Sequence, residues 1–214
     1  MKRQNPLHVF VRSALFLTSY IPLTVIIVLK QLLTNSSYLN FGGFSVESIL
    51  VMLKYFGVSA ILASLSIIGA IAVFVFTRNV ENTTALDGEK YVITDVANKN
   101  SESIGYIATY IVPFLFQDLT TPVEFLTFFI LLFVIFQIYI NSSLVVVNPV
   151  LNIWYSLYEI EATHVGESTR MRCTILNTER FLQEGDSIRM IEIGTKLNFS
   201  ISEDQRKEIY ERID

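Results

Sequence analysis

Charged side chains divide most of this chain into four long apolar runs. The runs cover residues 13–29, 55–77, 103–117 and 125–158. Charged groups are costly in hydrocarbon, and about 20 apolar residues suffice for one helical crossing. The pattern therefore predicts four membrane-spanning helices. We expect them at about residues 13–33, 55–77, 103–117 and 125–147, with a stalk that continues to residue 158.

The pattern changes to period two after residue 158. Met171, Cys173 and Ile175 alternate with polar residues, as in a strand with one buried face. Further strands are expected at residues 187–193 and 197–201, before a helix that begins with a capping box at Ser202 and Gln205. A short strand is also expected at residues 91–94, in a loop large enough to pack on this module.

The predicted fold class is therefore mostly α. We expect an integral membrane four-helix domain over residues 1–158, followed by a small cytoplasmic β-rich (α+β) module over residues 159–214. The composition agrees, because 51% of the 214 residues are hydrophobic and only 17% are charged. A soluble domain carries about 25% charged residues.

Lysine and arginine residues near the spans predict the orientation. They flank the first span on its N-terminal side and follow the second span, whereas the two other connections are poor in them. Because cytoplasmic loops carry an excess of these residues, we expect a multi-pass protein with both termini in the cytoplasm. If the third run does not cross, the C-terminal module lies on the other side of the membrane.

Small residues form one face of the second span. Ser59, Ala63, Ser66 and Ala70 lie on one side of a helical wheel, and small side chains allow close helix contact in membranes. The face serves either packing within the chain or self-association, and the two readings are about equally supported.

Three amides follow one side of the fourth span if it is a single helix. Gln137, Asn141 and Asn148 fall within about 40° on a helical wheel, and amides are unfavourable in lipid. The stripe predicts either hydrogen bonds between helices or the lining of a water-filled pore.

Aromatic residues mark two further candidate sites. Tyr106 and Tyr110 lie one turn apart in the third span, where Pro113 is expected to introduce a kink. Such a helix is either anchored at the membrane interface or adjustable, so that it relays a membrane disturbance. Tyr38, Phe41 and Phe44 form an outer aromatic loop beside two glycines, and we expect this loop to rest on the outer membrane surface.

No arrangement of residues typical of catalysis occurs. The chain has no phosphate-binding glycine loop and no zinc-protease or nucleophile-elbow motif, and its single cysteine, Cys173, is expected in the core. We therefore expect no enzyme activity, no metal and no cofactor. The C-terminal module carries 12 acidic and 8 basic residues, which disfavours direct nucleic-acid binding and permits a basic protein partner.

The layout resembles the KwaA family, the membrane subunit of the two-gene Kiwa antiphage system. The features shared are four spans, the sequence YIVPF at residues 110–114, Asn148-Pro149 at the end of the fourth span, and a β-containing tail. The resemblance implies an inner-membrane sensor of phage infection. It also implies a homo-oligomer, a tetramer, that contacts membrane lipids and works with KwaB, a cytoplasmic effector that binds DNA.

These observations lead to two hypotheses about function, which belong to different classes. The first is a membrane sensor and scaffold that recruits or activates the effector. The alternative is an ion channel or pore-forming effector lined by Gln137, Asn141 and Asn148.

Overall fold

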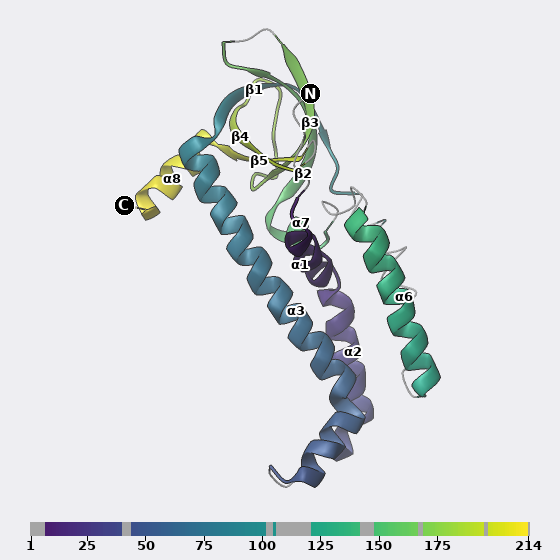
Figure 1. Cartoon of the computed structure of the whole chain (residues 1–214). Helices are drawn as coiled ribbons and strands as arrows, with labels where there is room; N and C mark the ends of the chain where they lie inside the picture. Colours follow the sequence, from purple (N-terminus) through teal and green to yellow (C-terminus); the bar gives the residue numbers. More distant parts are fainter. Residues whose placement is uncertain are drawn as a thin grey trace.

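The computed structural model of the chain describes residues 7–39, 44–101, 105, 121–141, 148–166, 169–194 and 197–213. The helices are α1 (Val9–Ser19), α2 (Ile21–Thr34), the short 3-10 helix η1 (Ser36–Tyr38), α3 (Val46–Asp87), α6 (Pro122–Asn141), α7 (Leu151–Trp154) and α8 (Glu203–Ile213). The strands are β1 (Glu89–Asn98), β2 (Ser156–His164), β3 (Arg170–Asn177), β4 (Ser187–Gly194) and β5 (Leu197–Ser202). Figure 1 shows a β-barrel at one end of a group of long helices.

Helix α3 is the longest element and connects the two parts. It begins after the N-cap residue Ser45, whose Oγ accepts from the backbone N–H of Ser48 over 3.2 Å. Its 42 residues extend roughly 63 Å, about twice the thickness of the hydrocarbon core. The helix therefore continues well past the predicted span at residues 55–77 and reaches the barrel (Figure 1).

Helices α1 and α2 replace the single first span. They meet at Tyr20 with a bend of 46°, because Pro22 at the start of α2 has no N–H for the helical ladder. Both helices pack on α3. The closest approach is at Gly69, where an added Cβ would lie 2.7 Å from Leu17 Cβ.

Helix α6 packs on α1 through aromatic side chains. The Phe16 ring lies 5.0 Å from Phe136 and 5.3 Å from Tyr139, measured between ring centroids. Arg12 Nη1 donates to the carbonyl oxygen of Ile140 over 2.6 Å, at the C-terminal end of α6. That end of α6 therefore lies next to the first turns of α1.

The predicted four-helix membrane protein is wrong for the described part of the chain. Two described helices, α3 and α6, are long and apolar enough to cross a membrane, or three spans exist if the bent pair counts as one. The first apolar run is interrupted at Tyr20, and the second is only part of a longer helix. The predicted third span, residues 103–117, lies outside the described residues except for Gly105.

The β-rich module is a closed five-stranded barrel, with strand order β1-β2-β3-β5-β4. The pairs are antiparallel except β3 with β5. The strand expected at residues 91–94 is confirmed as part of β1, so the barrel includes a segment from outside residues 159–214. The expected capping box is also confirmed, since Gln205 Oε1 accepts from the backbone N–H of Ser202 over 3.1 Å and Gln205 N–H donates to Ser202 Oγ.

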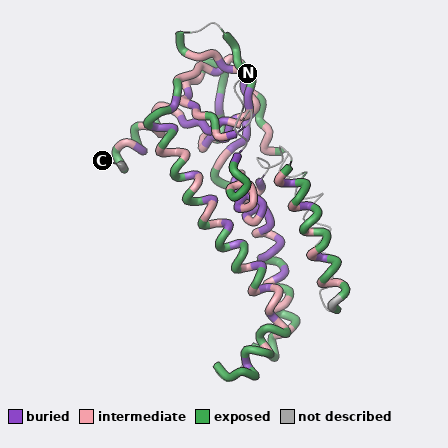
Figure 2. The backbone as a smooth tube through the Cα atoms, viewed as in Figure 1, coloured by how far each residue is buried: buried purple, intermediate pink, exposed green. Residues whose placement is uncertain are grey.

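Two hydrophobic clusters stabilise the structure. One fills the barrel and includes Ile93, Ile160 and Ile175. The other extends from Tyr139 in α6 through α1 to Phe199 on the barrel, so the helices and one barrel wall share a core. Figure 2 shows buried residues concentrated in the barrel and along α1, whereas much of α3 and α6 is exposed, as expected of helices that face lipid.

Candidate functional site

The candidate functional site is the junction where α3 enters the barrel. One residue, Gly88, separates the last residue of α3 from the first residue of β1. The N–H of Gly88 donates to the carbonyl oxygen of Thr84 over 3.0 Å, and a Cβ at this position would collide with that oxygen. Only glycine allows the backbone to pass so directly from helix to strand.

Two arginines from the barrel side hold the end of α3. Arg189 Nη1 donates to the carbonyl oxygen of Gly88 over 2.8 Å, and Arg206 Nε donates to that of Ala85 over 3.1 Å. The last carbonyl groups of a helix have no donors within the helix and carry partial negative charge. The two guanidinium groups supply hydrogen-bond donors and positive charge at this end of the helix. They also join α3 to β4 and α8.

Glu203 holds these cations together. Its carboxylate lies 3.4 Å from Arg189 Nε, 3.4 Å from Lys90 Nζ and 3.7 Å from Arg206 Nη1. Burial raises the pKa of this carboxyl, but the charges of Arg189 and Lys90, with a smaller part from Arg206, outweigh burial and lower the pKa overall. The junction is therefore a network of one carboxylate and three cations.

Asn148 is the second connection between the helices and the barrel side. Its side chain is fully buried, and its amide nitrogen donates to Leu15 O and to Thr18 Oγ1, both over 2.9 Å. Its amide oxygen accepts from the backbone N–H groups of Val150 and Leu151 at the start of α7. One side chain thus fixes α7 against the C-terminal half of α1.

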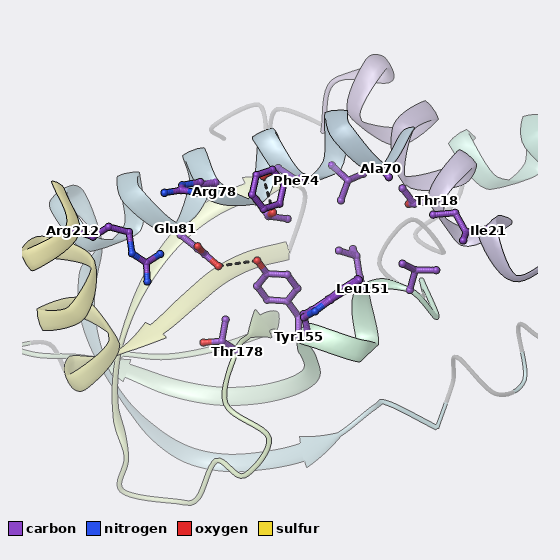
Figure 3. Close-up of a pocket in the computed structure, with 14 residues that line it drawn as sticks. Thr18, Ile21, Ala70, Phe74, Arg78, Glu81, Leu151, Tyr155, Thr178 and Arg212 are labelled. Carbon is purple, nitrogen blue, oxygen red and sulfur yellow. Dashed lines mark hydrogen bonds between the residues drawn. The ribbon is translucent and has the colours of Figure 1, made fainter. Parts of the chain in front are cut away.

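A cavity of about 620 Å³ lies beside the junction, between α3 and the segment of α7. We call it the junction cavity. Figure 3 shows its polar end with Arg78, Glu81 and Arg212, and the opposite end with Ala70 and Ile21. At the polar end, Tyr155 Oη donates to Glu81 Oε1 over 2.7 Å (Figure 3). Burial raises the pKa of the Tyr155 hydroxyl, so this group stays a proton donor at neutral pH.

The small-residue face of α3 packs within the chain. Ser59 Oγ donates to Gln31 Oε1 over 2.5 Å, and Ser66 Oγ shares a 3.0 Å hydrogen bond with Thr24 Oγ1, so both serines contact α2. Ala63 and Ala70 are half-buried and line a groove between the same two helices. The two serines therefore pack within the chain, whereas Ala63 and Ala70 border a groove.

The three amides of the predicted stripe do not stay together. Gln137 and Asn141 are exposed on α6, where Asn141 Nδ2 donates to the carbonyl oxygen of Gln137 over 2.9 Å. Asn148 instead lies outside the described extent of α6 and is buried against α1. One helical face therefore does not describe all three residues, because Gln137 and Asn141 are exposed and Asn148 is buried.

The aromatic candidates are only partly described. Tyr38 stacks on Tyr55 of α3, with ring centroids 3.9 Å apart. Phe44 is fully exposed and lies just before the start of α3, whose N-terminal end is far from the barrel (Figure 1). Phe41, Tyr106, Tyr110 and Pro113 lie outside the described residues.

Cys173 is buried in the barrel cluster, where burial raises its thiol pKa. Among the described residues, no group of three histidine, cysteine or acidic side chains is placed to hold a metal ion.

Comparison with known proteins identifies the family. The family model described as "Anti-phage protein KwaA" matches residues 11–199. The chain belongs to the KwaA family. The expected resemblance is thereby confirmed, and the chain is a member of an anti-phage defence family.

One curated relative is the Kiwa protein KwaA of Escherichia coli O55:H7 (strain RM12579 / EPEC). It is 32% identical over 96 residues, which cover 42% of this chain and 48% of the relative. The match thus spans about half the length of that protein. No solved structure matches the chain.

Replacing Asn148 tests its role as a connection. We expect Asn148→Ala to lower the free energy of unfolding by about 3 kcal/mol or more, because it leaves several buried donors and acceptors unpaired. Asn79→Ala is the matched control and should change it by less than about 0.5 kcal/mol, since that amide is exposed on α3. Thermal denaturation of the purified chain in mild detergent measures both. Equal effects of the two variants would contradict the assignment.

The Glu203 network predicts a loss of stability in acid. A carboxyl whose pKa is lowered by folding stabilises the protein above its unfolded pKa, and this stabilisation disappears as the pH falls through the folded value. We therefore expect the melting temperature to fall below about pH 4.5, the ordinary value of this group. Glu203→Gln should melt lower at pH 7 and depend less on pH, whereas Glu211→Gln, at an exposed position of α8, should retain the wild-type dependence.

Proposed function

We propose that this chain is the membrane-embedded sensor and scaffold of a bacterial antiphage system. In this proposal the helices register a disturbance of the cytoplasmic membrane, and the barrel recruits or activates a cytoplasmic effector. One observation carries the proposal: a single uninterrupted helix, α3, extends from the apolar region into the barrel with only Gly88 between them.

This continuity provides a mechanical connection. A 42-residue helix transmits tilt or rotation along its length, and its last carbonyls are bonded to Arg189 on β4 and Arg206 on α8. The barrel is closed, so its strands hold one another in place. A change of α3 in the bilayer would therefore move the barrel as a unit and change the surface that the effector contacts.

Membrane placement is supported by the exposed apolar side chains of the long helices. Ile67, Ile71 and Phe74 on α3 are 60–61% exposed in the isolated chain, and Phe133 and Ile138 on α6 are 59% and 50% exposed. Water would disfavour such surfaces, whereas lipid accepts them. The barrel lies at the Arg78 end of α3, and the positive flanks of the spans favour a cytoplasmic position for that end.

Self-association is supported by α6. Gln137 and Asn141 are exposed amides on an otherwise apolar helix, and such groups are unfavourable against lipid. Contact with α6 of another copy would give them partners, which agrees with the tetramer that the family resemblance implies. The pore alternative has less support, because Asn148 is buried and fully engaged with α1 and α7.

The effector expected as partner is KwaB, by the same resemblance. Residues 159–214 carry more acidic than basic side chains, which suits a basic protein surface and disfavours direct contact with nucleic acid. In this division of labour the chain needs neither a catalytic site nor a cofactor, and the partner acts on DNA.

Cysteine labelling tests the placement of the barrel. The native Cys173 is buried, so the unmodified chain serves as the unlabelled control. Phe181→Cys introduces a thiol at a position of the barrel that is 85% exposed, and Phe44→Cys introduces one at the far end of the molecule. In intact spheroplasts, a membrane-impermeant maleimide should label residue 44 and not residue 181, and lysis should expose residue 181. Labelling of residue 181 before lysis would overturn the cytoplasmic placement.

A flexible insertion tests the mechanical connection. Six Gly-Ser residues inserted after Gly88 should uncouple α3 from β1, so that protection against phage is lost in cells that also carry the effector gene. The chain should still reach the membrane and retain a protease-resistant barrel. The same six residues after Gly166, in an open turn of positive φ, provide the control and should leave protection intact. Full protection with the first insertion would show that α3 does not transmit the signal.

A further inference from the structure

The junction cavity continues into a second void at membrane depth. A groove of about 350 Å³ lies between α2 and α3, and both voids share Ile21 and Ala70 in their walls. The walls of the groove are apolar, with Val28 and Leu29 from α2 and Ala63 from α3. The two voids therefore form one path that leads from the polar end of the cavity along the helices, away from the barrel.

The path lies beside the bend of the N-terminal helices. At Tyr20 the chain turns by 46° between α1 and α2, which both pack on α3. The residues of α3 that face the bend, Ala63, Ser66 and Ala70, are too small to fill the space. An unfilled path of this size is unfavourable, because its walls lose packing contacts.

The polar end of the path carries two cations without partners in the described part of the chain. Arg78 on α3 and Arg212 on α8 both line the cavity, and neither makes an ion pair or a hydrogen bond with a described residue. The carboxylate there, Glu81, already accepts from Tyr155. The end of the path is therefore net positive and has free guanidinium donors (Figure 3).

The position of this end matches the headgroup layer of a bilayer. Arg78 directly follows the apolar run at residues 55–77, so it lies where that run leaves the hydrocarbon. Trp154, which also lines the cavity, is 64% exposed, and tryptophan favours the membrane interface. The apolar groove then lies within the hydrocarbon of the leaflet on the barrel side.

We propose that the path binds one anionic glycerophospholipid from the leaflet on the barrel side. Its phosphate lies between Arg78 and Arg212, and one acyl chain follows the groove past Ala70 between α2 and α3. A molecule with a negative head and a long apolar chain matches both ends of the path, whereas a small soluble anion would leave the groove empty. The inference rests on the membrane placement of α3 in the proposed function, and it deepens that function.

The bound lipid would connect the bilayer to the junction. It contacts α2 and α3 within the membrane, and its head joins α3 to α8 through the two arginines. The same α8 holds the end of α3 through Arg206. Removal or exchange of this lipid would therefore alter the contact between α3 and the barrel directly.

The test uses the purified full chain in mild detergent after removal of native lipid. Phosphatidylglycerol should bind as a single molecule in native mass spectrometry and should raise the melting temperature more than phosphatidylcholine does. The double variant Arg78→Gln/Arg212→Gln should bind phosphatidylglycerol about tenfold more weakly or worse, through loss of two charge-assisted contacts. Ala70→Phe should reduce binding of both lipids, because it blocks the groove where the two voids meet.

Matched variants separate the site from general effects. Arg170→Gln/Lys207→Gln removes the same charge from exposed positions, and Ile71→Phe adds a similar ring on the outward face of α3. Both should bind phosphatidylglycerol as the wild type does. The proposal is overturned if the two lipids bind equally, or if the folded arginine double variant retains wild-type affinity. The assay contains neither phage nor effector, so its failure would leave the insertion experiment as a separate test of the sensor function.

Discussion

The structure depends on how the end of one long helix is held. The last carbonyl groups of α3 have no donors of their own, and Arg189 and Arg206 supply them from β4 and α8. Glu203 keeps the two cations in place, and Gly88 leaves room for the chain to enter β1 at once. Without these contacts only the backbone at Gly88 would connect α3 to the barrel, and the helix could move without moving the barrel.

In the proposed membrane placement the bilayer sets a second constraint, because it favours apolar surface on the outside of the helices and penalises unpaired polar groups inside them. Serines of α3 therefore form hydrogen bonds with Gln31 and Thr24 of α2. The side chain of Asn148 forms four hydrogen bonds, two with α1 and two with the backbone at the start of α7. A path that the side chains do not fill lies beside the bend at Tyr20 and the junction. The lipid proposed there would contact both the apolar helices and α8 beside the junction.

Local patterns predicted much of the fold. Period-two alternation indicated the strands, and the spacing of Ser202 and Gln205 indicated the start of α8, because both signals lie within a few neighbouring residues. The helical wheel failed for Asn148, since it assumed a helix continuous with α6. The bend of the first span was missed although Pro22 was a visible signal. The junction residues Arg189 and Arg206 gave no signal, because their acceptors lie more than 100 positions away in the chain.

Hydrophobicity along the chain by itself determined that this protein has long apolar helices and a polar, acidic β-rich part, because solvent preference is a property of each residue. The layout of the apolar runs, together with the short sequences at residues 110–114 and 148–149 and the β-containing tail, carried the resemblance to the KwaA family. Only the tertiary structure decided that β1 closes the barrel, that α3 enters it without a linker, and that Arg78 and Arg212 both line one cavity. These relations join segments far apart in sequence, so they follow from packing in three dimensions and not from any local pattern.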